Sequence, residues 1–447
     1  MFSKPAEGSS KPEFQSWGRY PRLSANIVSL NWRTDFPLAS PPGTFVLPVG
    51  LGRSYGDCCL LDRGTLLDTR GMNRLISFDQ ATGLLRCEGG VSLADILAFA
   101  VPRGWFLPVT PGTKYVTIGG AIANDIHGKN HHVAGCFGSH VPRFELVRSD
   151  GTRMECSPTE NPQWYRSTIG GLGLTGLITW ADLEMRPIVS RRVTYKGTKF
   201  RGLDEFLELS RASSEVEYTV AWIDCVSQGT SFARGIFMQG EHSTVPEDLS
   251  RVEPREPRLS VPVTMPAMFL NHFTVGACNS LYYHKQFRRE TTATLDYEPF
   301  FFPLDSVLHW NRIYGRDGLL QFQCVLPEES YPRGMTEILR TITASGLASF
   351  LAVIKVFANK PSPGMMSFPR PGVTLTLDFP VRRNLTFELV DRLAFITLEY
   401  GGCMYPAKDA RMTPAQYQTF YPQWHDFARY IDPAFSSAFW QRVTANA

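Results

Sequence analysis

The chain of 447 residues lacks any apolar run long enough to cross a membrane. A transmembrane helix needs about 20 consecutive apolar residues, and the longest approach, LASFLAVIKVFA, is short and contains Lys355. The first residues, MFSKPAEGSSKPEFQSWGRYPR, also lack the apolar core of a secretory signal peptide. We therefore expect a protein that is soluble or attached peripherally to a membrane.

Paired cysteines and a strong charge imbalance are also missing. The nine cysteines are odd in number and form no C-x-x-C pair, which excludes an obvious disulfide framework or zinc ribbon and favours a reducing compartment. The 45 basic and 42 acidic residues leave a net charge of +3, which argues against a dedicated nucleic-acid binder. The 43% hydrophobic residues indicate a globular protein, and the length suggests two domains.

Several common catalytic and nucleotide-binding signatures are absent. The sequence has no Walker A motif, no G-x-S-x-G elbow and no Cys/His hydrolase signature. GLGLTG, at residues 171–176, matches G-x-G-x-x-G, but a predicted helix precedes it and a predicted strand follows it. A Rossmann site needs a strand, a glycine turn and then a helix, so we do not expect one here.

The N-terminal part, up to residue 190, is rich in glycine and in short apolar runs. One helix is predicted to begin after Ser92, which can cap it together with Asp95, three residues further on. Beyond residue 190 the composition changes, and the sequence predicts four strands that can share one sheet, at 217–226, 319–327, 350–358 and 372–380. This change suggests a domain boundary.

Two glycine-rich loops in the N-terminal part are candidates for holding phosphate groups. GLGRSYGD, at residues 50–57, follows an apolar strand, and its glycines can expose backbone N–H groups to phosphate oxygens. In TPGTKYVTIGGAIANDIHGKNHH, at 110–132, Gly119 and Gly120 allow a ligand to approach the backbone closely. Two such loops suggest a large cofactor with a pyrophosphate, and ordinary tight turns are the alternative.

The second loop places three histidines, His127, His131 and His132, within six positions. A His-x-x-x-His pair can bind zinc from one helix face. Here a glycine interrupts the pair, and only Asp125 and Cys136 are further candidate ligands nearby. We therefore expect no metal, and we assign one or two of these imidazoles to hydrogen bonds with a polar cofactor or with backbone.

Six motifs in a fixed order make the sequence similar to a known family. They are GLGRSYGD, TPGTKYVTIGGAIANDIHGKNHH, GGLGLTG, LLQFQCVLP, SFPRPGVTLTLDFP and YPAKDAR. Together they resemble the decaprenylphosphoryl-β-D-ribose 2′-oxidase family, in the vanillyl-alcohol-oxidase superfamily of flavoproteins. The resemblance implies an α+β, PCMH-type FAD-binding fold. Residues 1–190 and 403–447 would form a discontinuous FAD-binding domain, and residues 191–402 a substrate domain built on an antiparallel sheet.

The resemblance also implies which residues bind FAD. Many superfamily members link FAD covalently through a histidine in the loop that here reads GRS, but this sequence has Tyr55 at that place. Non-covalent FAD is therefore expected. The implied cofactor-binding residues are Gly50, Gly52, Arg53, Ser54, Tyr55, Gly56, Asp57, Gly112, Thr117, Ile118, Gly119, Gly120, Asn124, Asp125, Ile126, His127, Ile178 and Tyr405.

The reaction implied by the resemblance is oxidation of the 2′-hydroxyl of a polyprenyl-phosphoryl-β-D-ribofuranose to a ketone. FAD would accept the hydride, and a separate NAD(P)H-dependent short-chain reductase would complete an epimerisation to the arabinose donor for cell-envelope glycans. Lys408, Tyr55 and His127 would be catalytic, with Lys408 either a base or an electrostatic support. The implied substrate-binding residues are Gln321, Gln323, Lys355, Trp222 and Thr376.

Two features of the sequence bear on substrate choice. Some family members have a cysteine where this chain has Thr376, so thiol-directed inhibition is not expected to transfer. Residues 262–290, apolar and aromatic followed by HKQFRRE, can contact a membrane surface, or they form a surface loop over a partly buried apolar stretch. The expected location is the cytoplasm or the periphery of the inner membrane.

Two other functions remain open at this stage. A soluble alditol or aldonolactone oxidase would keep the flavin and change the substrate. A zinc protein or a lipid-sugar binding module would have no flavin at all.

Overall fold

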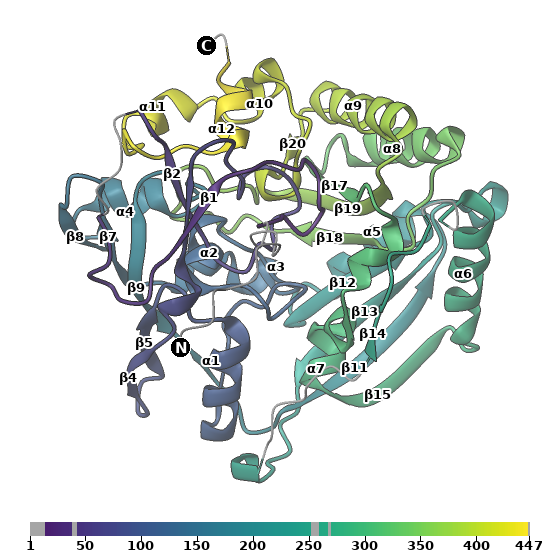
Figure 1. The fold of residues 1–447 in the computed structure, drawn as a ribbon. Helices are drawn as coiled ribbons and strands as arrows, with labels where there is room; N and C mark the ends of the chain where they lie inside the picture. The colour runs from purple at the N-terminus through teal and green to yellow at the C-terminus, as the bar shows by residue number, and fades with distance from the viewer. Residues whose placement is uncertain (1–13, 38–42, 252–258, 267–269, 446–447) are drawn as a thin grey trace, which may run out of the picture.

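The largest sheet of the protein has eight strands, and every neighbouring pair in it is antiparallel. The structure is a computed structural model and describes residues 14–37, 43–251, 259–266 and 270–445 (Figure 1). In sheet order the strands are β15 (Glu290–Asp296), β11 (Arg192–Phe200), β13 (Gly235–His242), β12 (Tyr218–Ile223), β18 (Ala352–Phe357), β19 (Gly372–Pro380), β17 (Leu319–Leu326) and β20 (Cys403–Met404).

The four strands predicted for one sheet are β12, β18, β19 and β17, and they are direct neighbours in it. Their two faces differ because successive side chains of a strand point to opposite sides. In β17, Phe322 and Cys324 belong to the hydrophobic core, whereas Gln321 and Gln323 line a cavity. β17 therefore contributes apolar side chains to the core on one face and glutamines to the cavity on the other.

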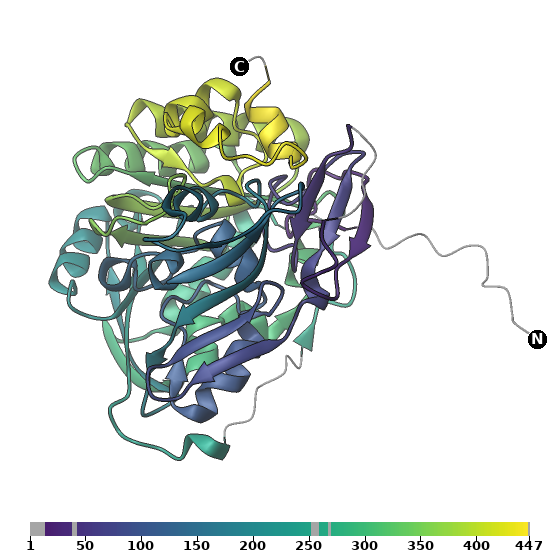
Figure 2. The same cartoon turned by 90° about the vertical axis from the view of Figure 1, so that its left-hand side faces the viewer.

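Two smaller sheets lie in the N-terminal part. The five-stranded one is antiparallel and consists of β4 (Leu75–Asp79), β5 (Leu84–Glu88), β9 (Leu177–Glu184), β7 (Arg143–Val147) and β8 (Arg153–Cys156). The three-stranded one is parallel and consists of β1 (Asn26–Ser29), β3 (Thr65–Asp68) and β2 (Val46–Val49), drawn in purple in Figure 2. The pairs β6 (Trp105–Phe106) with β10 (Arg186–Pro187) and β14 (Leu259–Ser260) with β16 (Val307–Leu308) are short ladders.

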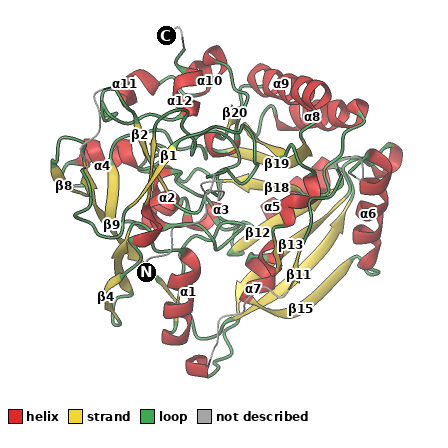
Figure 3. Cartoon of the chain, in the orientation of Figure 1, coloured by secondary structure: helices red, strands yellow, loops and turns green. Residues whose placement is uncertain are grey.

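Helices cover the sheets and fill the space between them. α2 contacts β9 and α3 contacts β18, so these helices lie between the five-stranded and eight-stranded sheets (Figure 3). The helices are α1 (Leu93–Ala100), α2 (Ile118–Ala123), α3 (His131–Ala134), α4 (Pro162–Thr168), α5 (Leu203–Ala212), α6 (His272–Lys285), α7 (Tyr297–Phe301), α8 (Tyr331–Ser345), α9 (Arg383–Glu399), α10 (Pro414–Phe420), α11 (Trp424–Ala428) and α12 (Ala438–Val443).

Local sequence explains where the longer helices begin and which face they bury. α1 starts at the predicted cap, because Ser92 and Asp95 form a capping box. α8 buries Met335, Ile338, Leu339 and Ile342, which recur at helical spacing along one face. That face packs with α9 against β17, on the side of the strand opposite to the cavity. Among the described residues no helix is both long and apolar enough to cross a membrane.

The C-terminal segment returns to the N-terminal part of the chain. Phe435 forms a parallel bridge with Val46 in β2, and Asp432 accepts a hydrogen bond of 2.8 Å from the backbone N–H of Ser149. These contacts join segments that lie hundreds of residues apart in sequence, and they bring the YPAKDAR loop next to the GLGRSYGD loop. The mixed helix and sheet architecture, with its large antiparallel sheet, confirms the expected fold class.

Candidate active site

A cavity of about 330 Å³ lies where the two glycine-rich loops meet the central strands of the eight-stranded sheet. Such a volume is within the usual range for a small-molecule site. Most of the predicted site residues line it: Gly50, Gly52, Arg53, Ser54, Tyr55, Gly112, Thr117, Gly119, Gly120, Asn124, Ile126, His127, Ile178, Gln321, Gln323, Lys355, Thr376, Tyr405 and Lys408. Segments from both ends and the middle of the chain therefore build one site.

Glycine is required where the two loops cross. A Cβ on Gly50 would lie 2.3 Å from the Thr117 hydroxyl oxygen, closer than any normal contact. Thr117 in turn caps α2, because its side chain accepts a hydrogen bond from the backbone of Gly120. The glycine patterns therefore bring backbone close to the cavity, as predicted, and the wall they make has little side chain.

Several polar atoms in the cavity wall are buried without a hydrogen-bond partner. These are Arg53 Nε, Asn124 Oδ1 and Gln321 Oε1. Buried polar atoms in proteins are nearly always paired, so these three call for polar groups of a ligand. The Arg53 guanidinium also lies 4.1 Å from the centre of the Trp17 ring at the cavity wall. A glycine-lined cradle with unpaired donors and acceptors fits a large polar cofactor such as FAD.

Lys408 reaches the cavity from the YPAKDAR loop and lies over the ring of Tyr55. Its Nζ atom is 4.1 Å from the ring centre, and the Tyr55 backbone N–H donates to the Ala407 carbonyl, which ties the two loops together. Burial lowers the pKa of Lys408 to about 8, against the opposing charge of Asp378. The lysine therefore titrates close to neutral pH, as a group that exchanges a proton with a substrate should.

His127 lines the cavity between two side chains from the eight-stranded sheet. Its Nδ1 atom is 3.1 Å from Lys355 Nζ, and its Nε2 atom is 3.0 Å from Gln323 Nε2. Burial, together with the nearby lysines, lowers the pKa of His127 well below its usual value, so the imidazole is neutral. Burial also lowers the pKa of Lys355 to about 7, and neighbouring Lys129 and Lys408 push it in the same direction.

The charge of Lys355 and the tautomer of His127 are linked. A neutral imidazole has one N–H and one acceptor nitrogen. If Gln323 donates to Nε2, the N–H is on Nδ1 and Lys355 accepts it as a neutral amine. If Lys355 is charged, Nδ1 accepts, and Nε2–H needs the carbonyl end of Gln323. Protonation of Lys355 therefore fixes Nδ1 as the acceptor and places the ring N–H on Nε2.

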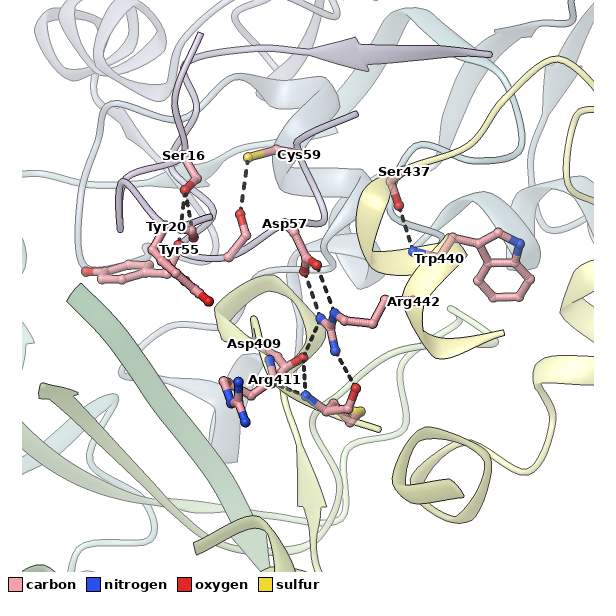
Figure 4. A network of polar contacts seen from close by, with 12 residues as sticks. Ser16, Tyr20, Tyr55, Asp57, Cys59, Asp409, Arg411, Ser437, Trp440 and Arg442 are labelled. Carbon is pink, nitrogen blue, oxygen red and sulfur yellow. Dashed lines mark hydrogen bonds and ion pairs between the residues drawn. The ribbon is translucent and has the colours of Figure 1, made fainter. Parts of the chain in front are cut away.

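Asp57 and Gly56 were predicted to bind the cofactor, but the structure places both outside the cavity wall. Arg442 of α12 donates to both Asp57 oxygens, at 2.9 and 2.8 Å, and to Asp409 at 2.9 Å (Figure 4). A Cβ on Gly56 would collide with the Asp409 carbonyl oxygen. The two residues instead hold the loop that carries Tyr55 against the loop that carries Lys408.

Other predicted residues also lie away from the cavity. Asp125 is fully buried and accepts from the backbone of Gly138 and from the hydroxyls of Ser362 and Ser367. Ile118 is part of the hydrophobic core. Trp222 faces α6, with its ring 4.8 Å from that of Tyr282. The direction in which each of these side chains points depends on the folded chain.

The cavity wall contains residues that sequence reasoning did not single out. Glycines 173 and 176 belong to GLGLTG. This turn does not have the order of elements of a Rossmann motif, but it contributes backbone to the cavity wall. Further lining residues lie within the quoted motifs or a predicted strand without being singled out: Pro111, Thr113, Val116, Ala123, Leu172, Leu351, Val353 and Ala407. The others lie outside those segments: Trp17, Cys59, Thr69, Gly89, Leu177, Leu304, Asp305 and Trp310.

The remaining histidines of the second loop have packing contacts. His131 is buried with its ring 4.4 Å from that of Phe357, and His132 Nε2 is 2.7 Å from the Val216 carbonyl oxygen. Within the described part of the chain, no group of three or more His, Cys, Asp or Glu side chains is arranged to hold a metal ion.

Comparisons with known proteins give the family. Residues 38–157 match the model of an FAD binding domain. The chain is 35% identical over 436 residues to decaprenylphosphoryl-β-D-ribose oxidase of Mycolicibacterium smegmatis, covering 93% of this chain and 94% of that protein. It is also 28% identical over 182 residues to mouse L-gulonolactone oxidase, covering 39% of this chain and 40% of that protein. The chain therefore belongs to the decaprenylphosphoryl-β-D-ribose oxidase family of FAD-dependent oxidoreductases, as its motifs predicted.

Proposed function

We propose that this protein oxidises the 2′-hydroxyl of a polyprenyl-phosphoryl-β-D-ribofuranose to the 2′-ketone, as the first half of an epimerisation to an arabinose donor. The observation that carries the proposal is the 35% identity, over 93% of the chain, to a protein with that named substrate. The cavity supports it, because buried lysines and glutamines suit a sugar with several hydroxyl groups. FAD, when bound, supplies the acceptor for the hydride.

Each polar side of the cavity has a task in this reaction. Removing hydride from C2′ requires that the hydroxyl proton leaves or that the developing alkoxide is stabilised. Lys408 is placed to do this, with Tyr55 holding its ammonium by a cation–π contact. Lys355 and His127 can bind a second sugar oxygen from the opposite side, and Gln321, Gln323 and Thr376 line the wall between them.

We further propose that FAD is bound without a covalent link. The GRS loop carries Tyr55, and His127, a histidine of the cavity wall, has its ring nitrogens in contact with Lys355 and Gln323. Denaturation followed by filtration should release all of the yellow colour into the filtrate. Flavin that stays with the precipitated chain would contradict this proposal.

The proposed domain division is residues 1–190 with 403–447 for FAD and residues 191–402 for the substrate. The ion pairs of Arg442 with Asp57 and Asp409 support the joining of the two chain ends. β20, at the proposed boundary, pairs with β17 and so connects the C-terminal segment to the substrate sheet.

The substrate is tested by anaerobic bleaching of the flavin. Polyprenyl-phosphoryl ribose should reduce the bound FAD, and free alditols or aldonolactones should not. The reverse pattern would favour the second candidate, a soluble aldonolactone or alditol oxidase, which the similarity to L-gulonolactone oxidase supports over 39% of the chain. The third candidate, a protein without flavin, is wrong, because the chain belongs to a family of FAD-dependent oxidoreductases.

The ketone product would need a reductase to become the arabinose epimer. We propose a separate NAD(P)H-dependent short-chain reductase as that partner, since only a hydride donor can return the 2′-carbon to an alcohol of opposite configuration. Adding such a reductase and NADPH to the oxidase reaction should convert ribose donor into arabinose donor. Ketone that persists in the mixture would argue against this pairing.

We also propose that residues 262–290 contact a membrane surface. From residue 259 to residue 289 the sequence has no acidic side chain, and it ends in Lys285, Arg288 and Arg289. Phe273, Leu281 and Phe287 expose 86, 74 and 95% of their surface there. Exposed apolar side chains beside cations are typical of binding to anionic lipid.

Vesicle binding tests this surface. The protein should cosediment with vesicles of phosphatidylglycerol more strongly than with phosphatidylcholine. Phe273→Ser with Phe287→Ser should weaken that binding about 10-fold. Phe395→Ser, an exposed phenylalanine on α9, is the matched control and should bind as the unchanged protein does. Equal binding by all three proteins would remove 262–290 from the contact.

A further inference from the structure

A buried carboxyl group lies directly behind the cavity wall. Asp378 of β19 is fully buried and is paired across the sheet with Gln321 of β17. The Gln321 side-chain amide donates a short hydrogen bond to Asp378 Oδ1, and the Asp378 backbone N–H donates to the Ser349 hydroxyl at 3.0 Å. Gln321 lines the cavity and Asp378 does not, so the carboxyl acts on the site through its neighbours.

The contact with Asp378 fixes the orientation of the Gln321 amide. A carboxylate only accepts hydrogen bonds, so the NH₂ end of the amide must point toward it. The carbonyl oxygen, Gln321 Oε1, is then the end of the amide left over, and it is buried without a partner. Gln321 therefore presents an acceptor, which recognises a hydroxyl or N–H of a ligand.

Asp378 and Lys408 also interact electrostatically. Its charge favours the protonated form of Lys408 against the effect of burial, and Lys408 favours the ionised form of Asp378 in return. Burial raises the pKa of Asp378 to about 7, and that of Lys408 is lowered to about 8. The two groups therefore exchange protons in the same narrow pH range.

Other ionisable groups lie around this pair. Tyr55 and Cys58 lie on the glycine-loop side of Lys408, and burial raises the pKa of both, so both are neutral at pH 7. Lys355, on β18, repels Lys408. The Tyr314 hydroxyl lies beside the Asp378 carboxyl, although neither it nor Asp378 Oδ2 makes a well-aligned hydrogen bond.

We propose that Asp378 is a positioning residue of the active site: it turns the Gln321 carbonyl toward the ligand as an acceptor, and its negative charge keeps a proton on Lys408. Neither effect requires contact between Asp378 and the substrate. The acceptor role rests on the proposed function, because it needs a ligand with hydroxyl groups. The electrostatic role is independent of which substrate is oxidised.

Two variants of the FAD-loaded enzyme separate the two roles. Asp378→Asn removes the charge and leaves the amide of Gln321 free to turn over. We expect KM to rise about 10-fold, from loss of one oriented hydrogen bond, and the ionisation near pH 8 in the rate of flavin reduction to move about one unit lower. Gln321→Met keeps the carboxyl but removes the hydrogen bond that favours its ionised form, so KM should rise while that ionisation moves less than in Asp378→Asn. A pH profile of Asp378→Asn that superimposes on the unchanged enzyme's would overturn the proposal.

A second measurement needs neither substrate nor flavin. The folded-state pKa of Asp378 is raised, so the flavin-free protein loses stability as pH rises from about 4 to about 7, while the Asn variant cannot ionise there. The unfolding temperature of Asp378→Asn relative to the unchanged protein should therefore increase over this range. A difference that stays constant from pH 4 to pH 8 would contradict a buried, ionising carboxyl. This result stands even if polyprenyl-phosphoryl ribose proves not to be the substrate.

Discussion

The two buried lysines of the cavity, Lys408 and Lys355, are of the same type but have opposite surroundings. Lys408, from the C-terminal segment, has the carboxyl of Asp378 nearby, and its pKa is about 8. Lys355, from β18, contacts His127 and is repelled by the buried Lys129, and its pKa is about 7. Lys408 therefore holds its proton to a higher pH than Lys355 does. The comparison suggests a charged, alkoxide-stabilising side and a neutral, hydrogen-bonding side.

Removal of Lys408 should have the largest effect. Lys408→Met should lower the rate of flavin reduction about 1000-fold, because it removes the proposed cation beside the reacting hydroxyl. Stopped-flow absorbance of the flavin measures the rate, and the same spectrum reports whether FAD is still bound. A loss of less than about 10-fold would place the proton chemistry on Lys355 and reverse the assignment of the two sides.

Arg442 forms ion pairs with Asp57 and Asp409, on the loops that carry Tyr55 and Lys408. Its loss should therefore lower the stability of the Lys408 side. Arg442→Met leaves Asp57 and Asp409, which are 5 and 1% exposed, without their partner. Unpairing buried charges costs about 3 kcal/mol of unfolding free energy. Denaturant unfolding should show this loss.

The matched control for Arg442 is Arg429→Met. Arg429 is 78% exposed and pairs with Asp426 on the surface, so its loss should cost less than about 0.5 kcal/mol. Equal costs for the two variants would show that the ion pairs of Figure 4 do not hold the loops together.

Lys355→Met should weaken substrate binding but raise the free energy of unfolding. Its folded pKa, about 7, is below that of a free lysine, so the buried ammonium costs stability below pH 7 and the cost fades as pH rises toward 10.5. The free energy of unfolding of the variant should exceed that of the unchanged protein by on the order of 1 kcal/mol at pH 6. The difference should be smaller at pH 9. KM should rise about 10-fold. A variant that is less stable at pH 6 would mean that the contact with His127 outweighs the burial of charge.

The smallest effect concerns the thiols beside Lys408. Burial raises the pKa of Cys58 to about 12 and that of Cys59 well above its usual value, so little thiolate exists at pH 7.5. Iodoacetamide should leave both unmodified by mass spectrometry while the exposed Cys278 reacts in the same sample. Alkylation of Cys58 with loss of activity would show that the Lys408 side opens more than the structure indicates.

Sequence predicted the parts of this molecule that depend on local order. The cap at Ser92, the four adjacent strands and the two glycine loops all follow from short patterns. The resemblance added the proposed roles of Lys408 and His127, and the family is confirmed.

The remaining features depend on contacts between distant segments. The sequence predicts that Asp57 belongs to a phosphate-binding loop. In the structure it pairs with Arg442, which lies 385 residues further along the chain. Asp378 shows no sign of its role, because only the register of β17 against β19 places Gln321 in front of it. Trp17 and Trp310, with ring centres 5.5 Å apart, likewise meet only in the folded chain.

The central claim, oxidation at the 2′-hydroxyl, is tested most directly with two substrates that differ by one oxygen. Polyprenyl-phosphoryl ribose and its 2′-deoxy analogue are each mixed anaerobically with the FAD-loaded enzyme, and the flavin absorbance is followed. The account predicts complete bleaching by the ribose compound and none by the 2′-deoxy compound, with one ketone formed for each flavin reduced. Bleaching by the 2′-deoxy analogue, or none by either compound, would contradict it.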